Sequence, residues 1–359
     1  MGRPAAVEGV VTTMRVLVTG HAGYIGTVLV PMLLERGHVV MGLDTFLYER
    51  CGIGRRPVPL PALRMDTRDV GAAHLGGFDA VIDLAAISND PLGDLNADTT
   101  FDINHRGTVN VARAAREAGV ERFVYSSSCS LYGAHGNAPI DESAAFRPVT
   151  PYGESKVLAE RDLTALATDD FSPVFLRNAT AYGVSPRLRG DLVVNNLTGY
   201  AVATGEVLLK SDGTPWRPLV HVEDIARAMV ACVEAPRERI HCEAFNVGAT
   251  SENYRIRDVA EIVADVVEGS AIGFGPGAGP DTRNYRVDCS KLAEVLPDAT
   301  PRWTVRDGAE QLRRLYEAEG MTREWLEGPR LQRLRHVRAL MDSGVLDGSL
   351  RWQPTEVLV

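Results

Sequence analysis

The first half of the chain alternates short, continuous apolar runs with longer segments in which apolar residues recur at helical spacing. Residues 14–20 (MRVLVTG) form one such run, and the segment at 23–37 that follows has a helical pattern. Continuous apolar strands that alternate with helices are typical of a parallel sheet covered on both faces. We therefore predict a doubly wound parallel α/β sheet. Its strands are expected at 14–20, 38–44, 63–66, 78–86, 122–128 and 171–179, with a returning strand at 244–248.

The pattern changes beyond residue 183, where the elements become short and arginines and Gly/Pro turns become frequent, as in GFGPGAGPD at 273–281. This change predicts a smaller α/β substrate-binding domain beside the Rossmann sheet. An arginine-rich tail follows, for which we expect a helix packed on the body, with a lid or a dimer contact as the alternative. The expected division is 14–182 with a returning segment at 219–250 for the Rossmann domain, 183–218 and 251–320 for the second domain, and 321–359 for a C-terminal helical extension.

Charge and composition narrow the class of protein. The 359 residues carry a formal net charge of −9, which argues against nucleic acid or an anionic membrane as a partner. The five cysteines are scattered without the spacing of a metal site, so we expect reduced thiols and no bound metal. Neither an apolar run of membrane-spanning length nor a signal-peptide pattern is evident, and a cytoplasmic location is expected.

A glycine-rich loop follows the first predicted strand and opens the first predicted helix. Gly20, Gly23 and Gly26 in TGHAGYIG allow a tight turn and a close approach of the backbone to a pyrophosphate at the helix N-terminus. Asp44 ends the second strand, where a carboxylate accepts hydrogen bonds from a ribose diol and repels a 2′-phosphate. Asp66 ends the third strand and is a candidate for the adenine edge, with a helix N-cap as the alternative. The pattern favours NAD over NADP.

Tyr152 and Lys156 stand four residues apart and share one face of a predicted helix. A tyrosine with a pKa near 10 is a poor base at neutral pH unless a neighbouring positive charge stabilises its phenolate. A lysine one helical turn away and a nicotinium ring supply that charge. The pair therefore predicts proton transfer coupled to hydride transfer.

These motifs together resemble the extended short-chain dehydrogenases/reductases of the nucleotide-sugar epimerase and dehydratase group, over roughly residues 14–315. The resemblance implies NAD as the cofactor and a nucleotide sugar as the substrate. It also implies a homodimer formed through the helices at 104–118 and 152–167. The motifs that carry it are TGHAGYIG, DLAA, NHRGT, SSSCSLYG, YGESK, NNL and RPLVHVEDIA.

The resemblance also implies roles for single residues. Ser128 would bond the reacting sugar oxygen, Tyr152 would act as acid and base, and Lys156 would support Tyr152 and bond the nicotinamide ribose. The family usually has a phosphate arginine just before the position of Asp281, where this sequence has Gly279 and Pro280, so Arg283 is taken as its substitute, with a plain surface arginine as the alternative. The cofactor set is Gly20, Gly23, Tyr24, Ile25, Gly26, Asp44, Asp66, Leu84, Ala85, Ala86, Asn104, Tyr152 and Lys156, and the substrate set is Ser88, Ser128, Ser130, Asn178, Asn196, Leu197, Arg217 and Arg283.

The two residues after Ser128 bear on the reaction. The 4,6-dehydratases of this family carry Asp and Glu there, because the loss of water needs an acid and a base. This chain has Cys129 and Ser130, and we expect Cys129 to be a buried small residue. The hypothesis favoured is epimerisation at carbon 4 through a transient 4-keto sugar. A keto-sugar reductase or dehydrogenase, a 4,6-dehydratase and a non-catalytic NAD-sensing regulator stay open, as do the nucleotide and the sugar.

Overall fold

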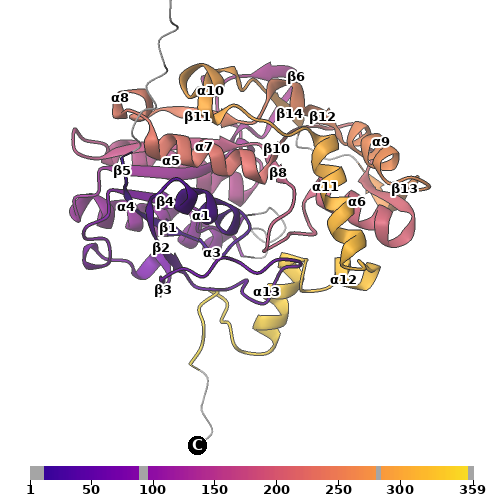
Figure 1. Ribbon diagram of the computed structural model, residues 1–359, viewed down its shortest axis with the longest axis horizontal. Coiled ribbons are helices and arrows are strands. Elements are labelled where there is room, and N and C mark those ends of the chain that lie inside the picture. The colour runs from indigo at the N-terminus through magenta and orange to yellow at the C-terminus, as the bar shows by residue number, and fades with distance from the viewer. Residues whose placement is uncertain (1–11, 89–95, 280–283, 355–359) are drawn as a thin grey trace, which may run out of the picture.

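The computed structural model describes residues 12–88, 96–279 and 284–354, and a parallel sheet of seven strands lies at its centre (Figure 1). These strands are β1 (Arg15–Thr19), β2 (Val39–Asp44), β3 (Ala62–Arg64), β4 (Ala80–Asp83), β5 (Arg122–Ser128), β7 (Ser172–Asn178) and β11 (Ala244–Val247). Their spatial order is β11-β7-β5-β4-β1-β2-β3, and every neighbouring pair is parallel. The predicted doubly wound Rossmann class is thereby confirmed. The chain order reverses between β1 and β4, and ligands bind at such switch points.

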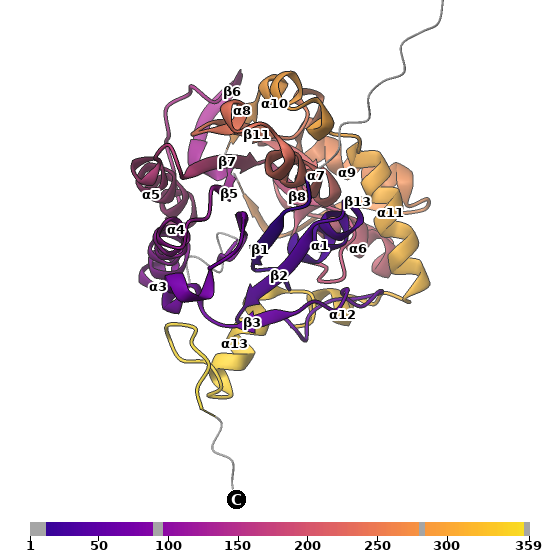
Figure 2. The same cartoon turned by 60° about the vertical axis from the view of Figure 1, so that its left-hand side comes forward.

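Helices cover both faces of this sheet, which explains why its strands read as unbroken apolar runs. Val16 and Val18 point to one face, where they share a core with Leu29 and Leu33. Leu17, between them in β1, points to the opposite face and a separate core. The first face is covered by α1 (Gly26–Glu35) and α7 (Val222–Glu234), and the second by α4 (Thr108–Glu117) and α5 (Pro151–Leu166) (Figure 2).

The helical segment before β5 differs from the prediction, which began it at Asn104. It begins with α3 (Ala97–Phe101), where the Asn96 side chain accepts a hydrogen bond of 3.1 Å from the Thr99 N–H. A π-helical turn at Asp102–Gly107 then joins α3 to α4. Wider turns of this kind occur frequently at functional sites, and hydrophobic periodicity does not reveal them.

A second region, with its own apolar core, lies beside the sheet. Its larger helices are α6 (Val193–Thr204), α9 (Ile256–Val266) and α11 (Val305–Ala318), whose buried residues include Leu197, Val263 and Leu312. Three small sheets complete it, namely β8 (Thr180–Tyr182) with β10 (Trp216–His221) and β12 (Asn253–Arg255), β9 (Glu206–Ser211) with β13 (Ala271–Gly279), and β6 (Ala134–Ile140) with β14 (Asn284–Val287). The remaining short elements are α8 (Arg237–Ile240), α10 (Ser290–Val295) and 3₁₀ turns at Thr67–Asp69, Ala72–His74, Cys129–Tyr132, Thr250–Glu252 and Pro297–Ala299.

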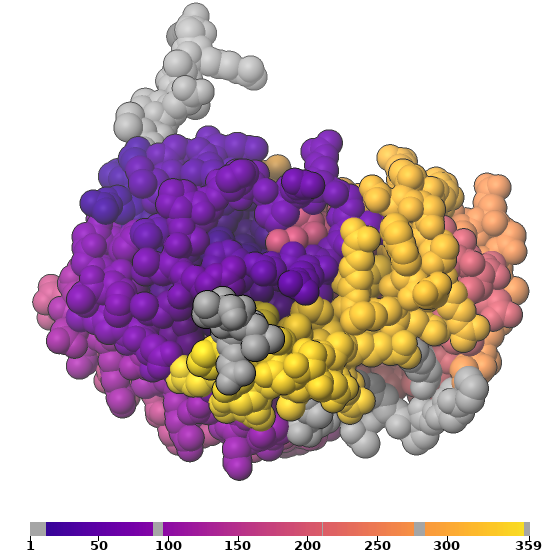
Figure 3. Space-filling view, turned by 90° about the horizontal axis from the view of Figure 1, so that it is seen from below, coloured from indigo at the N-terminus to yellow at the C-terminus, as the bar shows by residue number. Residues whose placement is uncertain are grey.

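The C-terminal segment runs from the second region to the Rossmann sheet through α12 (Arg323–Glu327) and α13 (Arg333–Asp342). Figure 3 shows this segment, in yellow, lying against the indigo and purple N-terminal half. Val337 and Leu350 form a small apolar cluster with Ile87, which follows β4. The helix expected in the arginine-rich tail is thus present as α13 and packs on the body. Among the described residues, no helix has the length and apolar character needed to cross a membrane.

Candidate active site

A cavity of about 890 Å³ opens at the carboxyl ends of the parallel strands, where the sheet meets the second region. Its volume lies toward the upper end of the roughly 300–1,000 Å³ typical of ligand pockets. The sequence motifs converge on it because β1, β2, β4, β5 and β7 all end there. The predicted residues that line it are Gly20, Gly23, Tyr24, Ile25, Gly26, Asp44, Asp66, Leu84, Ala85, Ala86, Ser88, Ser128, Ser130, Tyr152, Lys156, Asn178, Asn196, Leu197 and Arg217.

The three loop glycines have different steric reasons to be glycine. Gly20 has a φ of +65°, and a Cβ there would lie 2.8 Å from the Ala85 nitrogen. At Gly26 a Cβ would lie 2.5 Å from the carbonyl oxygen of His21, so α1 packs tightly on the loop. A Cβ at Gly23 would meet only the Gly20 carbonyl oxygen, at 3.1 Å, and Gly23 lines the cavity. The loop therefore leaves room for a pyrophosphate beside the start of α1, as a dinucleotide requires.

Asp44 is held in place by two backbone N–H groups. Its Oδ2 accepts a hydrogen bond of 3.0 Å from Ala22, and its Oδ1 accepts one of 2.7 Å from Phe46. Burial raises the pKa of this carboxyl, and the Phe46 N–H opposes the rise. Each oxygen retains lone pairs that a ribose diol can use. The side chain thus fits the predicted role at the adenosine ribose.

Asp66 serves the alternative role that the sequence left open. Its side chain accepts a hydrogen bond of 2.9 Å from the Arg68 N–H and so caps a short 3₁₀ turn. Burial would raise the pKa of this carboxyl, but the Arg68 side chain outweighs it and holds the pKa below its usual value. Asp66 also lines the cavity, so capping and a contact with the adenine end are compatible.

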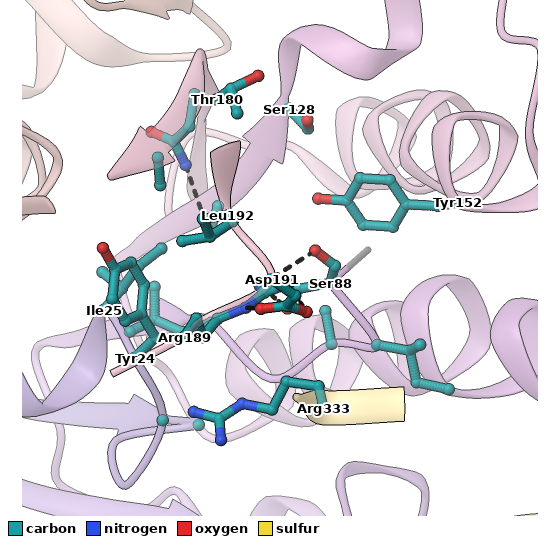
Figure 4. Close-up of a pocket in the computed structure, with 18 of the residues that line it drawn as sticks. Tyr24, Ile25, Ser88, Ser128, Tyr152, Thr180, Arg189, Asp191, Leu192 and Arg333 are labelled. Carbon is teal, nitrogen blue, oxygen red and sulfur yellow. Dashed lines mark hydrogen bonds and ion pairs between the residues drawn. The ribbon is translucent and has the colours of Figure 1, made fainter. Parts of the chain in front are cut away.

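Tyr152 reaches the cavity from the first turn of α5, and the start of that helix is fixed by local chemistry. The Thr150 hydroxyl accepts a hydrogen bond of 3.2 Å from Gly153, and Pro151 occupies the first turn. A Cβ at Gly153 would lie 2.8 Å from the Ser130 carbonyl oxygen, so α5 begins close against the end of β5. In Figure 4 the Tyr152 hydroxyl therefore points into the same space that Ser128 borders.

Lys156 lies one turn along α5, and 3% of it is exposed. Its Nζ donates a hydrogen bond of 2.8 Å to the Ser126 carbonyl oxygen and lies 5.8 Å from the centre of the Tyr152 ring. Burial lowers the pKa of Lys156 to about 8, against the opposing effects of the Asp83 and Glu160 carboxylates. The ammonium is thus close enough to favour the phenolate of Tyr152.

The residues after Ser128 offer no acid and base pair. The Cys129 thiol is buried and donates to the Arg177 carbonyl oxygen at 3.1 Å, and burial raises its pKa well above the usual range. Ser130 does line the cavity, and its Oγ accepts a hydrogen bond of 3.1 Å from the Ser128 hydroxyl. Cys129 is therefore the buried small residue that we expected, and the pocket holds a pair of hydroxyls at this point.

The far end of the cavity is bordered by Asn178, at the end of β7, and by residues of the second region. Asn178 is held by its Nδ2, which donates to the Ser126 hydroxyl at 3.0 Å, while its buried Oδ1 has no hydrogen-bond partner within the described part of the chain. The Asn196 Nδ2 donates a hydrogen bond of 2.7 Å to the Gly190 carbonyl oxygen. Arg217 brings a positive charge to this end and is 7% exposed. A free acceptor and a buried cation suit a polar ligand that carries phosphate.

Among the predicted residues that the structure describes, Asn104 is not brought into the cavity. Asn104 lies behind its wall, where its Oδ1 accepts from the Ile87 N–H at 2.7 Å and its Nδ2 donates to the Ile87 carbonyl oxygen at 2.9 Å. The π-helical turn presents it to the loop after β4, so Asn104 positions that loop and does not line the site. Arg283 lies outside the described residues.

An ion pair that was not predicted also borders the cavity. The Arg189 guanidinium donates two hydrogen bonds of 3.0 Å to the Asp191 carboxylate and a third, of 2.9 Å, to the Ser88 hydroxyl (Figure 4). Burial would raise the pKa of Asp191, but the Arg189 charge outweighs it and keeps that pKa below its usual value. Asp191 is therefore ionised and cannot serve as a proton donor. The signal in the sequence was PRLRGD, which falls shortly after the strand that carries Asn178.

The C-terminal segment supplies two further wall residues that were not predicted, Arg333 and Leu350. Tyr48, in the loop after β2, lies beside Arg333 and also lines the cavity. No local motif marks these positions, because their side chains meet the site only through the packing of α13 on the sheet.

Comparison with known proteins gives consistent matches. The model of the NAD dependent epimerase/dehydratase family matches residues 16–248. The chain is 32% identical over 301 residues to the UDP-glucose 4-epimerase of Mycolicibacterium smegmatis, an alignment that covers 79% of this chain and 92% of that enzyme. It resembles the structure of MoeE5 in complex with UDP-glucuronic acid and NAD, with a TM-score of 0.71, 29% identity, and coverage of 87% of this chain and 98% of that one. The dTDP-glucose 4,6-dehydratase DesIV of Streptomyces venezuelae, with NAD and TYD bound, gives a TM-score of 0.75 at 26% identity, covering 87% and 100% of the two chains.

Proposed function

The chain belongs to the NAD dependent epimerase/dehydratase family and uses NAD as its cofactor, and we propose that it epimerises a nucleotide sugar at carbon 4. The single observation that carries this proposal is the make-up of the cavity around Ser128. Tyr152 and Lys156 border it, while Cys129 points away and Ser130 contributes only a hydroxyl. Among the residues that the structure describes, the site thus contains what the movement of a hydride needs, and no acid and base pair for elimination lies beside Ser128.

The carboxylates that line the described part of the cavity are not placed to act as an acid and base pair on the sugar. Among the residues that the structure describes, three carboxylates line the cavity. Asp44 and Asp66 lie at the predicted adenosine end. The ionised carboxylate of Asp191 is paired with the Arg189 guanidinium. Loss of a sugar hydroxyl needs an acid for the leaving oxygen and a base for the neighbouring carbon. This observation favours epimerisation over 4,6-dehydration.

Proton transfer in the proposed reaction falls to Tyr152. When bound, NAD supplies the acceptor for the hydride of carbon 4 and later its donor. The Tyr152 phenolate takes the proton of the sugar's 4-hydroxyl as the carbonyl forms, and the Ser128 hydroxyl bonds the same oxygen. The Lys156 ammonium stabilises the phenolate of Tyr152, so that this base is available near neutral pH. On return, Tyr152 gives the proton back to the oxygen, and hydride delivery to the opposite face of the sugar inverts carbon 4.

The nucleotide sugar is expected to span the cavity toward the second region. Its diphosphate would meet Arg217, and its nucleotide would lie near Asn196 and Leu197. The name UDP-glucose 4-epimerase among the relatives supports a UDP-sugar as the first substrate to test. The homodimer through α4 and α5 and the cytoplasmic location stay predictions.

The test is a panel of UDP-, dTDP-, GDP-, CDP- and ADP-sugars incubated with the purified protein and no added cofactor. We expect one substrate to reach a mixture of two 4-epimers by NMR, because the cofactor is regenerated in each turnover. A 4-keto-6-deoxy product would indicate a dehydratase, and a stoichiometric demand for NADH would indicate a reductase. Either result would overturn the proposal.

A further inference from the structure

The C-terminal segment covers the cavity at the predicted cofactor end, outside the part of the chain that the family model matches. That match ends at residue 248, and the MoeE5 alignment covers nearly all of its chain but only 87% of this one. Three contacts fasten the segment beside β2 and β3. The His336 Nε2 meets the Leu47 carbonyl oxygen at 2.8 Å, the Trp352 Nε1 donates to Thr45 at 2.8 Å, and Arg351 pairs with Asp69 at 2.6 Å.

This covering segment inserts one charged side chain into the cavity. Arg333 opens α13 and lines the pocket, and Figure 4 shows its guanidinium extending into the space below Tyr24 and Arg189. The residue is 3% exposed, and its guanidinium carbon lies 4.5 Å from the centre of the Tyr48 ring. Stacking on Tyr48 fixes the plane of the guanidinium and pre-organises it for a ligand.

The hydrogen bonds of Arg333 are incomplete. Its Nη2 donates a hydrogen bond of 2.7 Å to the Arg187 carbonyl oxygen. Its Nη1 is buried and has no hydrogen-bond partner within the described residues. Leaving a buried charged donor without a partner is costly, and native structures seldom keep one. An oxygen ligand in the cavity would complete it.

The charge around Arg333 calls for an anion. Arg187 lies next to it and is fastened to the glycine-rich loop by a hydrogen bond of 3.3 Å from its Nε to the Ala22 carbonyl oxygen. Burial lowers the pKa of Arg187, and the charge of Arg333 lowers it further. The neighbouring carboxylate of Asp191 is already paired with Arg189. Arg333 and the half-buried Arg187 thus share one corner, where Asp44 and Glu49 act on Arg187 but no described carboxylate forms an ion pair with either guanidinium.

We propose that Arg333 binds the diphosphate of NAD, so that the C-terminal segment acts as a latch that holds the cofactor in place. The contacts of Arg333 decide between the two diphosphates that the cavity could receive. They are with Tyr48, which follows Asp44, and with Arg187, which is bonded to the glycine-rich loop. The diphosphate of a nucleotide sugar would instead be served by Arg217 at the other end. The latch rests on the NAD site and not on the reaction proposed above.

The test compares Arg333→Met with Arg338→Met, an exposed arginine on the same helix, in the full-length chain. Binding of NAD, ADP, adenosine and UDP is measured by calorimetry after bound nucleotide has been removed, and the NAD content of freshly purified protein is measured by its absorbance after release. We expect Arg333→Met to weaken NAD and ADP by about 10- to 100-fold, since a charged hydrogen bond is lost. Adenosine, which has no phosphate, and UDP should bind as before, and Arg338→Met should match the wild type.

Each other pattern overturns the latch. An equal loss for adenosine would show that Arg333 only supports local packing. A loss confined to UDP would assign the residue to the nucleotide sugar, and unchanged NAD binding would leave it without a ligand. Arg333→Lys guards against a variant that fails to fold, because it keeps the charge but loses the planar fork. It should retain the wild-type melting temperature without ligand and show a smaller but measurable loss of NAD affinity, and wild-type affinity in Arg333→Lys and Arg333→Met alike would contradict the proposal.

Discussion

Replacing Tyr152 by phenylalanine is expected to lower kcat by about 100- to 10,000-fold, the range attributed to one positioned acid or base. The substitution removes only the hydroxyl that points into the cavity beside Ser128. The ring and the start of α5 stay in place, so the NAD content of the purified protein should not change. Initial rates of epimer formation and the absorbance of released NAD measure the two quantities on the same sample.

The matched control for this variant is Tyr254→Phe. The Tyr254 hydroxyl donates a hydrogen bond of 3.2 Å to Glu252 and does not border the cavity. The Tyr254→Phe variant should therefore keep wild-type kcat with at most a small loss of stability. Turnover by Tyr152→Phe at the wild-type rate would exclude Tyr152 as the proton carrier, whatever its position in the cavity.

Lys156→Met is expected to lower kcat by about 100-fold or more at pH 7.5. The ammonium favours the phenolate, so its removal leaves less of Tyr152 ionised at a given pH. The acidic limb of the pH–kcat profile should therefore move to higher pH, and the deficit should shrink as the pH rises toward 10. A deficit that is the same at every pH would contradict the role of Lys156 as the charge that activates Tyr152.

The stability of Lys156→Met separates this effect from misfolding. The folded pKa of Lys156 is lowered to about 8 from an ordinary value of 10.5, so the unfolded chain binds more protons between these values. This group therefore makes the free energy of unfolding rise with pH from about 8 to 10.5, and the variant should lose that rise. Lys291→Met is the control. Lys291 does not line the cavity, and its Nζ forms an ion pair of 2.6 Å with Glu243. This control should retain both wild-type kcat and the stability rise.

The parts of the site that could be predicted from the sequence are those whose geometry is local. One strand–turn–helix unit sets the steric requirement for glycine at Gly20, Gly23 and Gly26. Their spacing alone puts Tyr152 and Lys156 on one face of a helix. The parallel sheet then brings these units together, because its strands end at one edge. For the same reason the strand residues at the cavity all lie where the predicted topology puts them.

The rest depends on contacts between distant segments, which periodicity does not encode. Asn104 was assigned to the cofactor, but a π-helical turn directs it to Ile87. The tail pattern indicated a helix but not the surface on which it docks, so Arg333 and Leu350 could not be placed in the cavity. Such contacts are set by packing between α13 and loops almost 300 residues earlier in the chain, as between His336 and Leu47, 289 residues apart.

The central claim, a hydride that leaves carbon 4 and returns to it, is tested most directly with a nucleotide sugar deuterated at carbon 4. The protein is incubated with this substrate and no added cofactor, and the product is analysed by NMR and mass spectrometry. We expect two 4-epimers that both carry the deuterium at carbon 4. Deuterium found at carbon 6 of a deoxy sugar, or in reduced cofactor released to solution, would contradict it.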